Sequence, residues 1–348
     1  MKIGLVIYGS LDTVSGGYLY DRRLVSFLRE QGDEVRIISL PWRNYAAHLT
    51  DNLRFRLPRG FDLLIQDELN HPSLLAANAR PHPYPLISLV HHLRSSEDHP
   101  VWQRTFYRFI EQGYLRSVDG FIFNSKTTRD VVHALAGNEK PNLVAYPPTD
   151  RFRAGLSAPL VSARSGQSTP LRILFLGNVI PRKGLGTLLA AIRHQPSAFS
   201  LDIVGSLITG PAYARKMQAL AHDLPTSIHF HGVLDDELLV EQLRQAHVLV
   251  VPSSYEGYGI VYLEGMVFGL PAVGTTGGAA SEIITDGETG YLVPPGDAVT
   301  LAARLAGLAA DRDLLRRMSF KALERYRSQP AWDQTAKDIR AFLLEMAS

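Results

Sequence analysis

Two glutamates with seven residues between them mark the segment of the sequence with the most specific chemistry. Residues 253–265 have the sequence SSYEGYGIVYLEG, which follows an expected strand and opens an expected helix. The first amides of a helix have no helical acceptor, so this end suits a phosphate group. Carboxylates placed beside it would accept hydrogen bonds from ribose and hexose hydroxyls, whereas two solvated glutamates on a capping loop are the alternative. The candidate ligand-binding residues are Glu256, Gly257, Tyr258, Gly259, Ile260, Val261 and Glu264.

Two adjacent cations lie at the start of another expected helix, in the sequence LGNVIPRKG over residues 176–184. Arg182 and Lys183 oppose the helix dipole there, which is unfavourable unless an anion lies between them. A diphosphate would be such an anion. Two exposed surface cations are the alternative interpretation.

Two weaker candidates lie in the first half of the chain. Gly16 and Gly17 follow the first expected strand, where backbone amides would approach a phosphate, but Gly9 lies seven residues before Gly16. This spacing differs from the GxGxxG of dinucleotide-binding proteins, so we expect no NAD site. His91 ends a strand and is either an acid-base group or a structural histidine. The histidines show no metal-ligand spacing, and we expect neither a metal nor another cofactor.

Composition limits the class of protein. The 348 residues contain no Cys, which excludes a disulfide scaffold, thiolate catalysis and a Cys-ligated zinc site. The net charge of +2 is too small to suggest a nucleic-acid partner. The sequence shows neither a secretory signal nor the run of about 18 apolar residues that a spanning helix needs. We therefore expect a cytoplasmic protein.

Short apolar runs alternate with amphipathic stretches along almost the whole chain. This alternation predicts an α/β fold with parallel sheets, and the length predicts two doubly wound domains. Ligands bind beyond the carboxyl ends of such strands, so we expect one site in a cleft between the domains. Residues 153–170, rich in Ser, Ala, Gly and Pro, predict a linker or surface loop. The expected domains are 1–152, completed by a C-terminal helix at about 331–348, and 153–330.

The individual elements follow from the same alternation. Expected strands in the first domain are 3–8, 35–40, 62–66, 86–91, 120–124 and 142–146, with a helix at 18–31. Expected strands in the second domain are 171–176, 200–204, 228–231, 248–251 and 270–273. Expected helices there are 184–194, 211–222, 236–245, 260–268 and 298–309, before two helical stretches split by Pro330.

Taken together, these segments resemble family 4 of the retaining glycosyltransferases, which have the two-Rossmann GT-B fold. The resemblance spans nearly the entire chain. One position departs from it, because the family commonly has Arg after the glycine matched by Gly177 and this chain has Asn178. Further matching positions are Tyr146-Pro147-Pro148 with Asp150 and Phe152, His231 to Asp236, Gly277-Gly278 with Glu282, and Asp286-Gly287 with Gly290.

The resemblance implies a role for each candidate residue. Glu256 would contact the donor hexose, Glu264 the ribose, and Lys183 with Arg182 the diphosphate. Val233 and its neighbours would line the base pocket, and His91 would lie close to the reacting centre. The implied catalytic residues are Glu256, His91, Lys183 and Arg182; Gly16, Gly17 and Asn178 join the donor-binding set, with Arg182 supplying the charge missing at Asn178.

The implied reaction transfers a hexose from a nucleotide sugar to a hydroxyl of an acceptor sugar, lipid or small molecule. UDP-glucose or a related UDP-sugar is the expected donor. The family retains the anomeric configuration, and no divalent ion is required if cations and amides stabilise the leaving diphosphate. The alternatives are a sugar-nucleotide epimerase or phosphorylase of this shape, and a non-catalytic nucleotide-sugar-binding protein.

Membrane contact is a separate question. Aromatic and basic residues mix in one part of the first domain, a composition that suits lipid headgroups, although solvated loop residues are the favoured interpretation. These residues are Trp42, Arg43, Arg54, Phe55, Arg56 and Arg59. The expected helix 101–115 carries Trp102, Phe106, Phe109 and Ile110, which we interpret as core residues. Peripheral attachment at the inner face of a membrane stays open.

Overall fold

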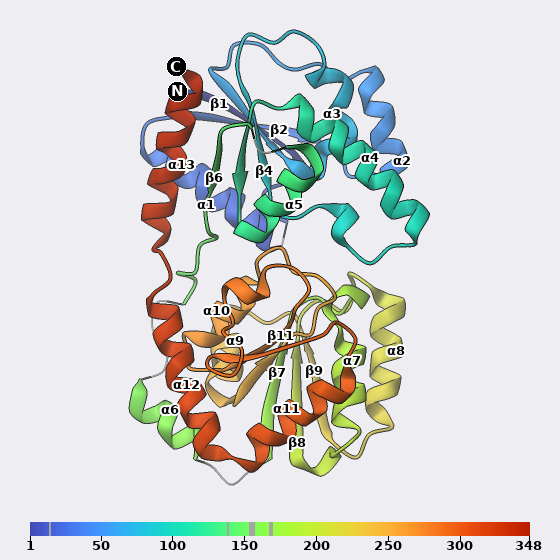
Figure 1. Cartoon of the computed structure of the whole chain (residues 1–348), viewed down its shortest axis with the longest axis vertical. Helices are drawn as coiled ribbons and strands as arrows, with labels where there is room; N and C mark the ends of the chain where they lie inside the picture. Colours follow the sequence, from blue (N-terminus) through green and yellow to red (C-terminus); the bar gives the residue numbers. More distant parts are fainter. Residues whose placement is uncertain (14, 138, 153–156, 167–169) are drawn as a thin grey trace. The chain divides into compact units, whose positions relative to one another are not determined.

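A computed structural model describes residues 1–348 except 14, 138, 153–156 and 167–169. The chain forms two compact units (Figure 1). Unit 1 contains Met1–Pro148 and Pro330–Ser348, and unit 2 contains Thr149–Gln329. These divisions lie within a few residues of the expected domain limits at 152 and 330.

Unit 1 is built on a six-stranded parallel sheet with the strand order β2-β1-β3-β4-β5-β6. The order reverses between β1 and β3, which creates a topological switch point at the carboxyl ends of these strands. The strands are β1 (Lys2–Tyr8), β2 (Glu34–Leu40), β3 (Leu63–Asp67), β4 (Leu86–Val90), β5 (Gly120–Phe123) and β6 (Asn142–Val144). The helices are α1 (Gly16–Glu30), α2 (Tyr45–Leu49), α3 (His71–Asn78), α4 (Val101–Ser117), α5 (Lys126–Ala136) and α13 (Trp332–Ala347).

Both faces of this sheet are covered, which explains why its central strands are nearly continuous apolar runs. One face packs against α1 and α13, and the other against α3, α4 and α5. Trp332 of α13 packs edge-on against Tyr20 of α1 with 5.2 Å between ring centroids. A helix from the end of the sequence therefore completes the core of unit 1.

Unit 2 has a second six-stranded parallel sheet with the order β12-β11-β10-β7-β8-β9. Its switch point lies between β7 and β10, the central neighbours from which the order runs outward in both directions. The strands are β7 (Leu171–Leu176), β8 (Phe199–Val204), β9 (Ser227–Gly232), β10 (Val248–Val250), β11 (Ala272–Thr275) and β12 (Gly290–Val293). The helices are α6 (Ala158–Ser165), α7 (Leu185–Ile192), α8 (Pro211–His222), α9 (Asp236–Gln245), α10 (Ile260–Met266), α11 (Ala298–Ala310) and α12 (Arg312–Arg327).

The expectation of a linker or loop over 153–170 is wrong for its central part. Residues 158–165 form α6, in which Val161, Arg164 and Ser165 are buried. Arg164 donates hydrogen bonds to the Phe268 and Gly269 carbonyl oxygens at 3.0 and 2.8 Å. Residues 153–156 and 167–169 of the expected linker lie outside the described residues.

The expectation that Trp102, Phe106 and Phe109 are core residues is also wrong. All three side chains are exposed on α4, while Ile110 is half-buried. The buried side of α4 instead carries Tyr107, Glu111, Tyr114 and Leu115. Because large apolar residues occupy both sides of this helix, helical periodicity alone points to the wrong one.

Among the described residues, no helix combines the length and the apolar character required to cross a bilayer.

Candidate functional site

The best-defined site in unit 2 lies at the switch point of its sheet. The loop after β7 carries Lys183, and the loop after β10 carries Glu256. The Lys183 ammonium forms an ion pair with Glu256 Oε1, and both side chains are largely buried. The structure therefore brings together two residues that the sequence assigns to neighbouring parts of a donor.

Backbone contacts between the two loops fix the position of Lys183. Ser254 N donates to the Arg182 carbonyl oxygen at 2.8 Å, and Arg182 donates to the Tyr255 carbonyl oxygen at 2.9 Å. Gly184 has a φ of +74°, and a Cβ there would lie 2.0 Å from the Pro252 carbonyl oxygen. Only glycine fits this conformation and this close approach. Lys183 ends a 3-10 turn, Pro181–Lys183, which precedes α7.

A third loop holds Glu256 from the other side. Glu256 N donates to the Gly277 carbonyl oxygen at 3.1 Å, and Ala279 N donates to the Glu256 carbonyl oxygen at 2.8 Å. Ser253 Oγ donates to Glu256 Oε1 at 2.6 Å. Sequence reasoning missed the role of Ser253, although its position three residues before Glu256 was visible.

Charge compensation determines the ionisation of Glu256. Burial alone would raise the pKa of this carboxyl, but the positive charges of Lys183 and Arg182 overcome that effect and lower the pKa below its usual value. Glu256 is thus a buried carboxylate with cations on one side, and the interpretation of a solvated glutamate is wrong.

Glu264 is the second buried carboxylate of this segment. Arg151 donates to Glu264 Oε1 at 3.0 Å and to Asp236 Oδ1 at 2.6 Å. Burial raises the pKa of Glu264, and the charge of Arg151 offsets part of that rise. Sequence reasoning named the neighbours Asp150 and Phe152 but missed Arg151, which nothing in the local sequence distinguishes from other surface arginines.

The remaining candidate donor-binding residues in unit 2 differ in their burial and in their hydrogen bonds. Asn178 Oδ1 accepts a hydrogen bond from Ser206 N at 3.4 Å, and Val233 is 68% exposed. Tyr258 is buried and its hydroxyl accepts from Gln329 Nε2 at 2.6 Å. Gly259 has a φ of +94° and precedes α10, which opens with Ile260 and Val261. Since α10 has seven residues, its dipole is small and the side-chain cations dominate the local field.

In unit 1 the structure brings His91 next to Gly17. A Cβ on Gly17 would lie 3.1 Å from His91 Cδ2, so the glycine allows the ring to approach the first turn of α1. His91 Nε2 lies 3.2 Å from Oδ1 of the fully buried Asp21. Burial alone would lower the pKa of His91, but Asp21, Asp67 and Glu68 raise it above its usual value. Gly16 opens the same helix.

A second polar cluster in unit 1 consists of Glu68, His71 and Glu111, all of which are fully or almost fully buried. Burial raises the pKa of Glu68 to about 8 and that of Glu111 to about 7, and it lowers that of His71 to about 4. His71 Nδ1 lies 3.0 Å from Glu68 Oε1, and Tyr45 Oη lies 2.8 Å from His71 Nε2. Sequence reasoning did not identify this cluster.

Among the described residues of unit 1, two trios have ligand atoms close enough to share a cation, namely Asp21-Asp67-His91 and Glu68-His71-Glu111. In the second trio both ring nitrogens of His71 already have protein neighbours. A structural role therefore accounts for that histidine.

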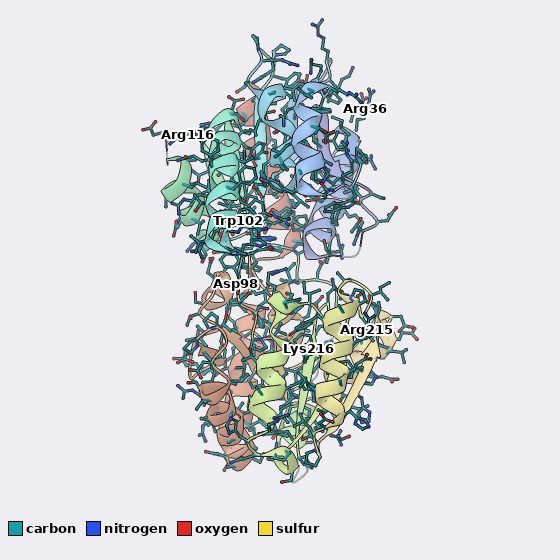
Figure 2. The ribbon with its side chains drawn as sticks, turned by 90° about the vertical axis from the view of Figure 1, so that its right-hand side faces the viewer. Arg36, Asp98, Trp102, Arg116, Arg215 and Lys216 are labelled. Atoms are coloured by element: carbon teal, nitrogen blue, oxygen red, sulfur yellow. The ribbon has the colours of Figure 1, made fainter. Side chains whose placement is uncertain are left out.

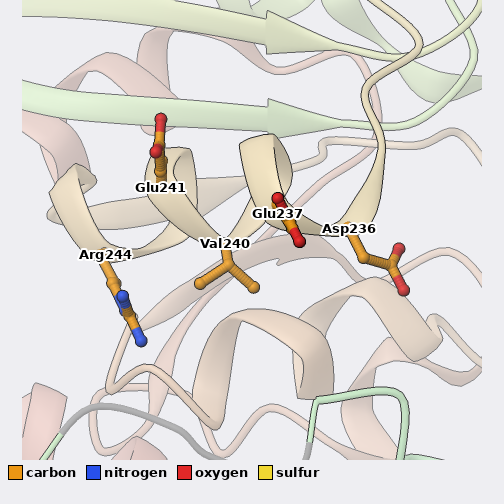
Figure 3. A pocket seen from close by; sticks show the side chains of 5 residues that line it. All are labelled: Asp236, Glu237, Val240, Glu241 and Arg244. Atoms are coloured by element: carbon orange, nitrogen blue, oxygen red, sulfur yellow. The ribbon is translucent and has the colours of Figure 1, made fainter.

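A surface pocket on α9 is lined by Asp236, Glu237, Val240, Glu241 and Arg244 (Figure 3). Three of these five side chains are carboxylates, which would repel a diphosphate. This pocket is a poor candidate for the anion site. The Lys183-Glu256 region provides two cations instead.

Comparisons with known proteins place this chain among glycosyltransferase relatives. The family model for "Glycosyl transferases group 1" matches residues 162–325, which include Lys183, Glu256 and Glu264. A phosphatidyl-myo-inositol mannosyltransferase of Mycobacterium leprae is 27% identical over 91% of this chain and 89% of its own length. A GDP-mannose-dependent alpha-(1-6)-phosphatidylinositol monomannoside mannosyltransferase of Mycobacterium tuberculosis is 31% identical over 56% of this chain and 53% of its own length.

The fold comparison covers both units. A sucrose-phosphate synthase structure from Thermosynechococcus elongatus has a TM-score of 0.81 and 20% identity, over 99% of this chain and 98% of that one. The epimerase and the non-catalytic alternatives find no support among these relatives. The predicted GT-B fold is confirmed, and the chain is a family 4-like glycosyltransferase.

Proposed function

We propose that this glycosyltransferase moves a hexose from a nucleoside diphosphate sugar to an acceptor hydroxyl with retention of configuration and without a catalytic metal. The observation that carries the proposal is the buried Lys183-Glu256 ion pair at the switch point of unit 2. Open α/β sheets bind ligands at this point. A buried ion pair contributes little net stability, so a role in ligand binding explains this pair better than a role in folding.

In this proposal Lys183 and Arg182 stabilise the leaving group. Cleavage of the bond between the anomeric carbon and the phosphate oxygen places negative charge on the diphosphate. Cations that are held by the backbone before the reaction lower the barrier without reorganisation. The hydrogen bonds that tie Arg182 to the 254–255 backbone supply that rigidity.

Glu256 and Glu264 recognise the sugars of the donor. A carboxylate accepts hydrogen bonds only, so each can hold two hydroxyl groups. We assign Glu256 to the transferred hexose and Glu264 to the ribose, with Arg151 keeping Glu264 ionised and oriented before the ribose binds. Glu256 is no covalent nucleophile here; the departing phosphate oxygen helps to deprotonate the acceptor on the same face. His91, oriented by Asp21, donates a hydrogen bond to substrate from unit 1.

The donor base and hexose are the finer part of the proposal. Sequence analysis favours a UDP-sugar, whereas the 31% identical relative is named for GDP-mannose. We therefore place GDP-mannose first and UDP-glucose second. The same relatives are named for inositol-containing lipids, so phosphatidylinositol is the first acceptor to test.

A calorimetric titration with GDP-mannose, UDP-glucose and ADP-glucose in the presence of EDTA tests the donor. Binding of one of these sugars, followed by slow hydrolysis without acceptor, is expected. Glu264→Gln should weaken binding of the nucleotide sugar roughly tenfold, since a hydrogen bond to a charged group is worth about 1.5–3 kcal/mol.

Glu241→Gln, on the α9 pocket, is the matched control and should bind the donor like the original chain. No binding of any nucleotide sugar, or a strict requirement for a divalent ion, would contradict the proposal. NMR of the product then determines whether the anomeric configuration is retained.

A further inference from the structure

Two strand ends at the switch point of the unit 1 sheet carry metal-ligand side chains on one face. Asp67 is the last residue of β3, and His91 directly follows β4. Asp67 pairs with Leu89 in the parallel register, and His91 lies two residues after Leu89. Because side chains alternate between the two faces of a sheet, Asp67 and His91 belong to the same face, which is the face packed against α1.

The third group comes from α1. Asp21 lies three and seven residues before Leu24 and Leu28, which pack on this face, so Asp21 is on the side of the helix that meets the sheet. Asp21 Oδ1 lies 3.2 Å from His91 Nε2. The ligand atoms of Asp21, Asp67 and His91 all lie within 4.8 Å of one another. We call these three residues the switch-point trio.

Two buried acidic groups of the trio share a single imidazole. Asp21 is fully buried, and Asp67 is 5% exposed. Among the described residues, neither carboxyl group forms an ion pair with a lysine or an arginine, and Asp21 Oδ2 is buried without a hydrogen-bond partner. A buried oxygen of this kind costs free energy, and a bound cation would remove that cost.

The surrounding chain holds the imidazole of the trio in place. The Tyr20 ring contacts the His91 ring edge-on with 5.3 Å between centroids, and Asn124 Nδ2 donates to the His91 carbonyl oxygen at 2.7 Å. His91 is also the most exposed member of the trio, with 16% of its side chain exposed. An ion from solvent would therefore enter past this ring.

We propose that the switch-point trio binds a divalent cation of the zinc type. Zn²⁺ binds imidazole nitrogen and carboxylate oxygen at about 2.0–2.2 Å, which places the ligand atoms of a tetrahedral site about 3.4 Å apart. Small side-chain rotations would bring the atoms of the trio to that spacing, and a water molecule would take the fourth position. Mg²⁺ suits the trio less, because it prefers oxygen ligands and keeps several waters.

The cation would oppose the proposed reaction. A cation bound to Nε2 replaces the contact with Asp21 that orients the His91 ring, so it should inhibit transfer. This consequence rests on the role proposed for His91, whereas the cation site itself does not.

Calorimetric titration of the EDTA-treated full chain with ZnCl₂ tests the site. A single Zn²⁺ ion should bind to each chain. Asp67→Asn should weaken this binding at least about tenfold, because loss of even an outer-shell partner of a metal ligand costs about 10–100-fold in affinity. No binding of Zn²⁺ by the original chain, or equal affinity in Asp67→Asn, would overturn the proposal.

Cobalt locates the site without any substitution. Co²⁺ accepts ligands similar to those of Zn²⁺, and its paramagnetism shifts and broadens nearby proton resonances. The ring protons of His91 should be affected most, and those of His231 in unit 2 least. An effect that is strongest on a histidine outside the trio would overturn the proposal.

Two other clusters of unit 1 provide controls. The loop before α4 holds His92 and His99 at 3.0 and 3.4 Å from the Glu97 carboxylate, and Asp98 of the same loop is exposed (Figure 2). This loop is the main competitor for Zn²⁺. Glu97→Gln, and Glu111→Gln in the second trio, should bind Zn²⁺ like the original chain. Loss of binding in either control with none in Asp67→Asn would overturn the proposal.

Transfer assays separate the site from its consequence. Zn²⁺ should inhibit the original chain, EDTA should restore its activity, and Asp67→Asn should need at least about tenfold more Zn²⁺ for equal inhibition. Inhibition at the same Zn²⁺ concentration in Asp67→Asn would overturn the proposal. Binding at the trio without inhibition would support the site and remove the role proposed for His91. A chain without transferase activity would contradict the proposed function, while calorimetry and NMR would still decide on the site.

Discussion

The two units bury acidic side chains in opposite ways. In unit 2, Glu256 lies beside two cations, and the pKa of its carboxyl falls even though burial opposes that change. In unit 1, Glu68 and Glu111 lie beside a histidine whose own pKa is lowered by burial, and their pKa values rise to about 8 and about 7. Burial is similar in both places, so the neighbouring charge decides the ionisation.

Near neutral pH the carboxyl of Glu256 is therefore ionised, whereas the carboxyls of Glu68 and Glu111 bind protons. A permanent negative charge with permanent positive neighbours suits a ligand that carries both hydroxyls and phosphates. A cluster that binds protons near neutral pH suits packing, because neutral carboxyls cost less to bury. We therefore place the proposed chemistry at the switch point of unit 2.

The largest effect is expected for Lys183→Ala. Removing one fixed donor from a developing negative charge costs about 10²–10³ in turnover. The sequence alone predicts little effect of this substitution on folding. The structure predicts a loss of stability as well, because Glu256 would become a buried carboxylate without its ion-pair partner, which costs roughly 3–5 kcal/mol. Initial rates and urea unfolding measure the two effects.

The double change Lys183→Ala, Glu256→Gln provides the control for that prediction. Removing both charges should restore much of the stability but none of the turnover. Restored turnover would show that Lys183 acts only by neutralising Glu256 and not on the diphosphate.

The next largest effect concerns Glu111→Gln in unit 1. The folded-state pKa of Glu111 is about 7 against 4.5 in the unfolded chain, so its contribution to stability is fully present below pH 4.5 and lost as pH rises through about 7. At pH 8 the variant should be more stable by about 3 kcal/mol, and at pH 4 nearly unchanged. All three tryptophans, Trp42, Trp102 and Trp332, lie in unit 1, so urea unfolding followed by tryptophan fluorescence reports this unit.

A smaller effect with the opposite sign is expected in unit 2. The folded-state pKa of Glu256 is lowered, so its contribution is present above the unfolded value of 4.5 and lost as pH falls below it. As pH falls below 4.5, the free energy of unfolding of unit 2 should decrease in the original chain and change less in Glu256→Gln. Hydrogen exchange of the β10 and β11 amides measures this unit, and an unchanged slope in the variant would contradict the assignment.

The smallest effect is expected for Asp21→Asn. Loss of the carboxylate beside Nε2 should lower the pKa of His91, because Asp21 is the strongest of the groups that raise it. NMR titration of the His91 ring protons measures the change. The ring protons of His231, which pairs with Asp202 at 2.7 Å in unit 2, serve as the internal reference because the substitution lies in unit 1.

Much of the fold follows from the sequence because parallel strands buried on both faces are apolar throughout. The sequence-based expectation for β7 coincides with its bounds in the structure. Among the elements that the sequence did not predict, two have a clear physical reason. β12 has the short sequence GYLV among turn residues. The helix α6 has the sequence APLVSARS, and the hydrogen bond from Arg164 to the Phe268 carbonyl oxygen ties it to a distant segment.

The site was predictable only in part. Glycines and charges placed after strands indicated both loops of the Lys183-Glu256 pair. The partners that depend on tertiary contacts, such as Arg151 with Glu264 and Asp21 with His91, lie 113 and 70 residues apart and leave no local pattern. The exposed side of α4 was predicted wrongly because both of its sides carry aromatic residues.

The return of α13 to unit 1 has a consequence for biosynthesis. Residues 149–329 form a continuous stretch and can complete their core as soon as they leave the ribosome. Unit 1 is translated first, yet its core includes Trp332, Ala336, Ile339 and Leu343. The nascent first 148 residues must therefore wait, with one face of their sheet covered by α1 but not by α13, until the whole of unit 2 has been made.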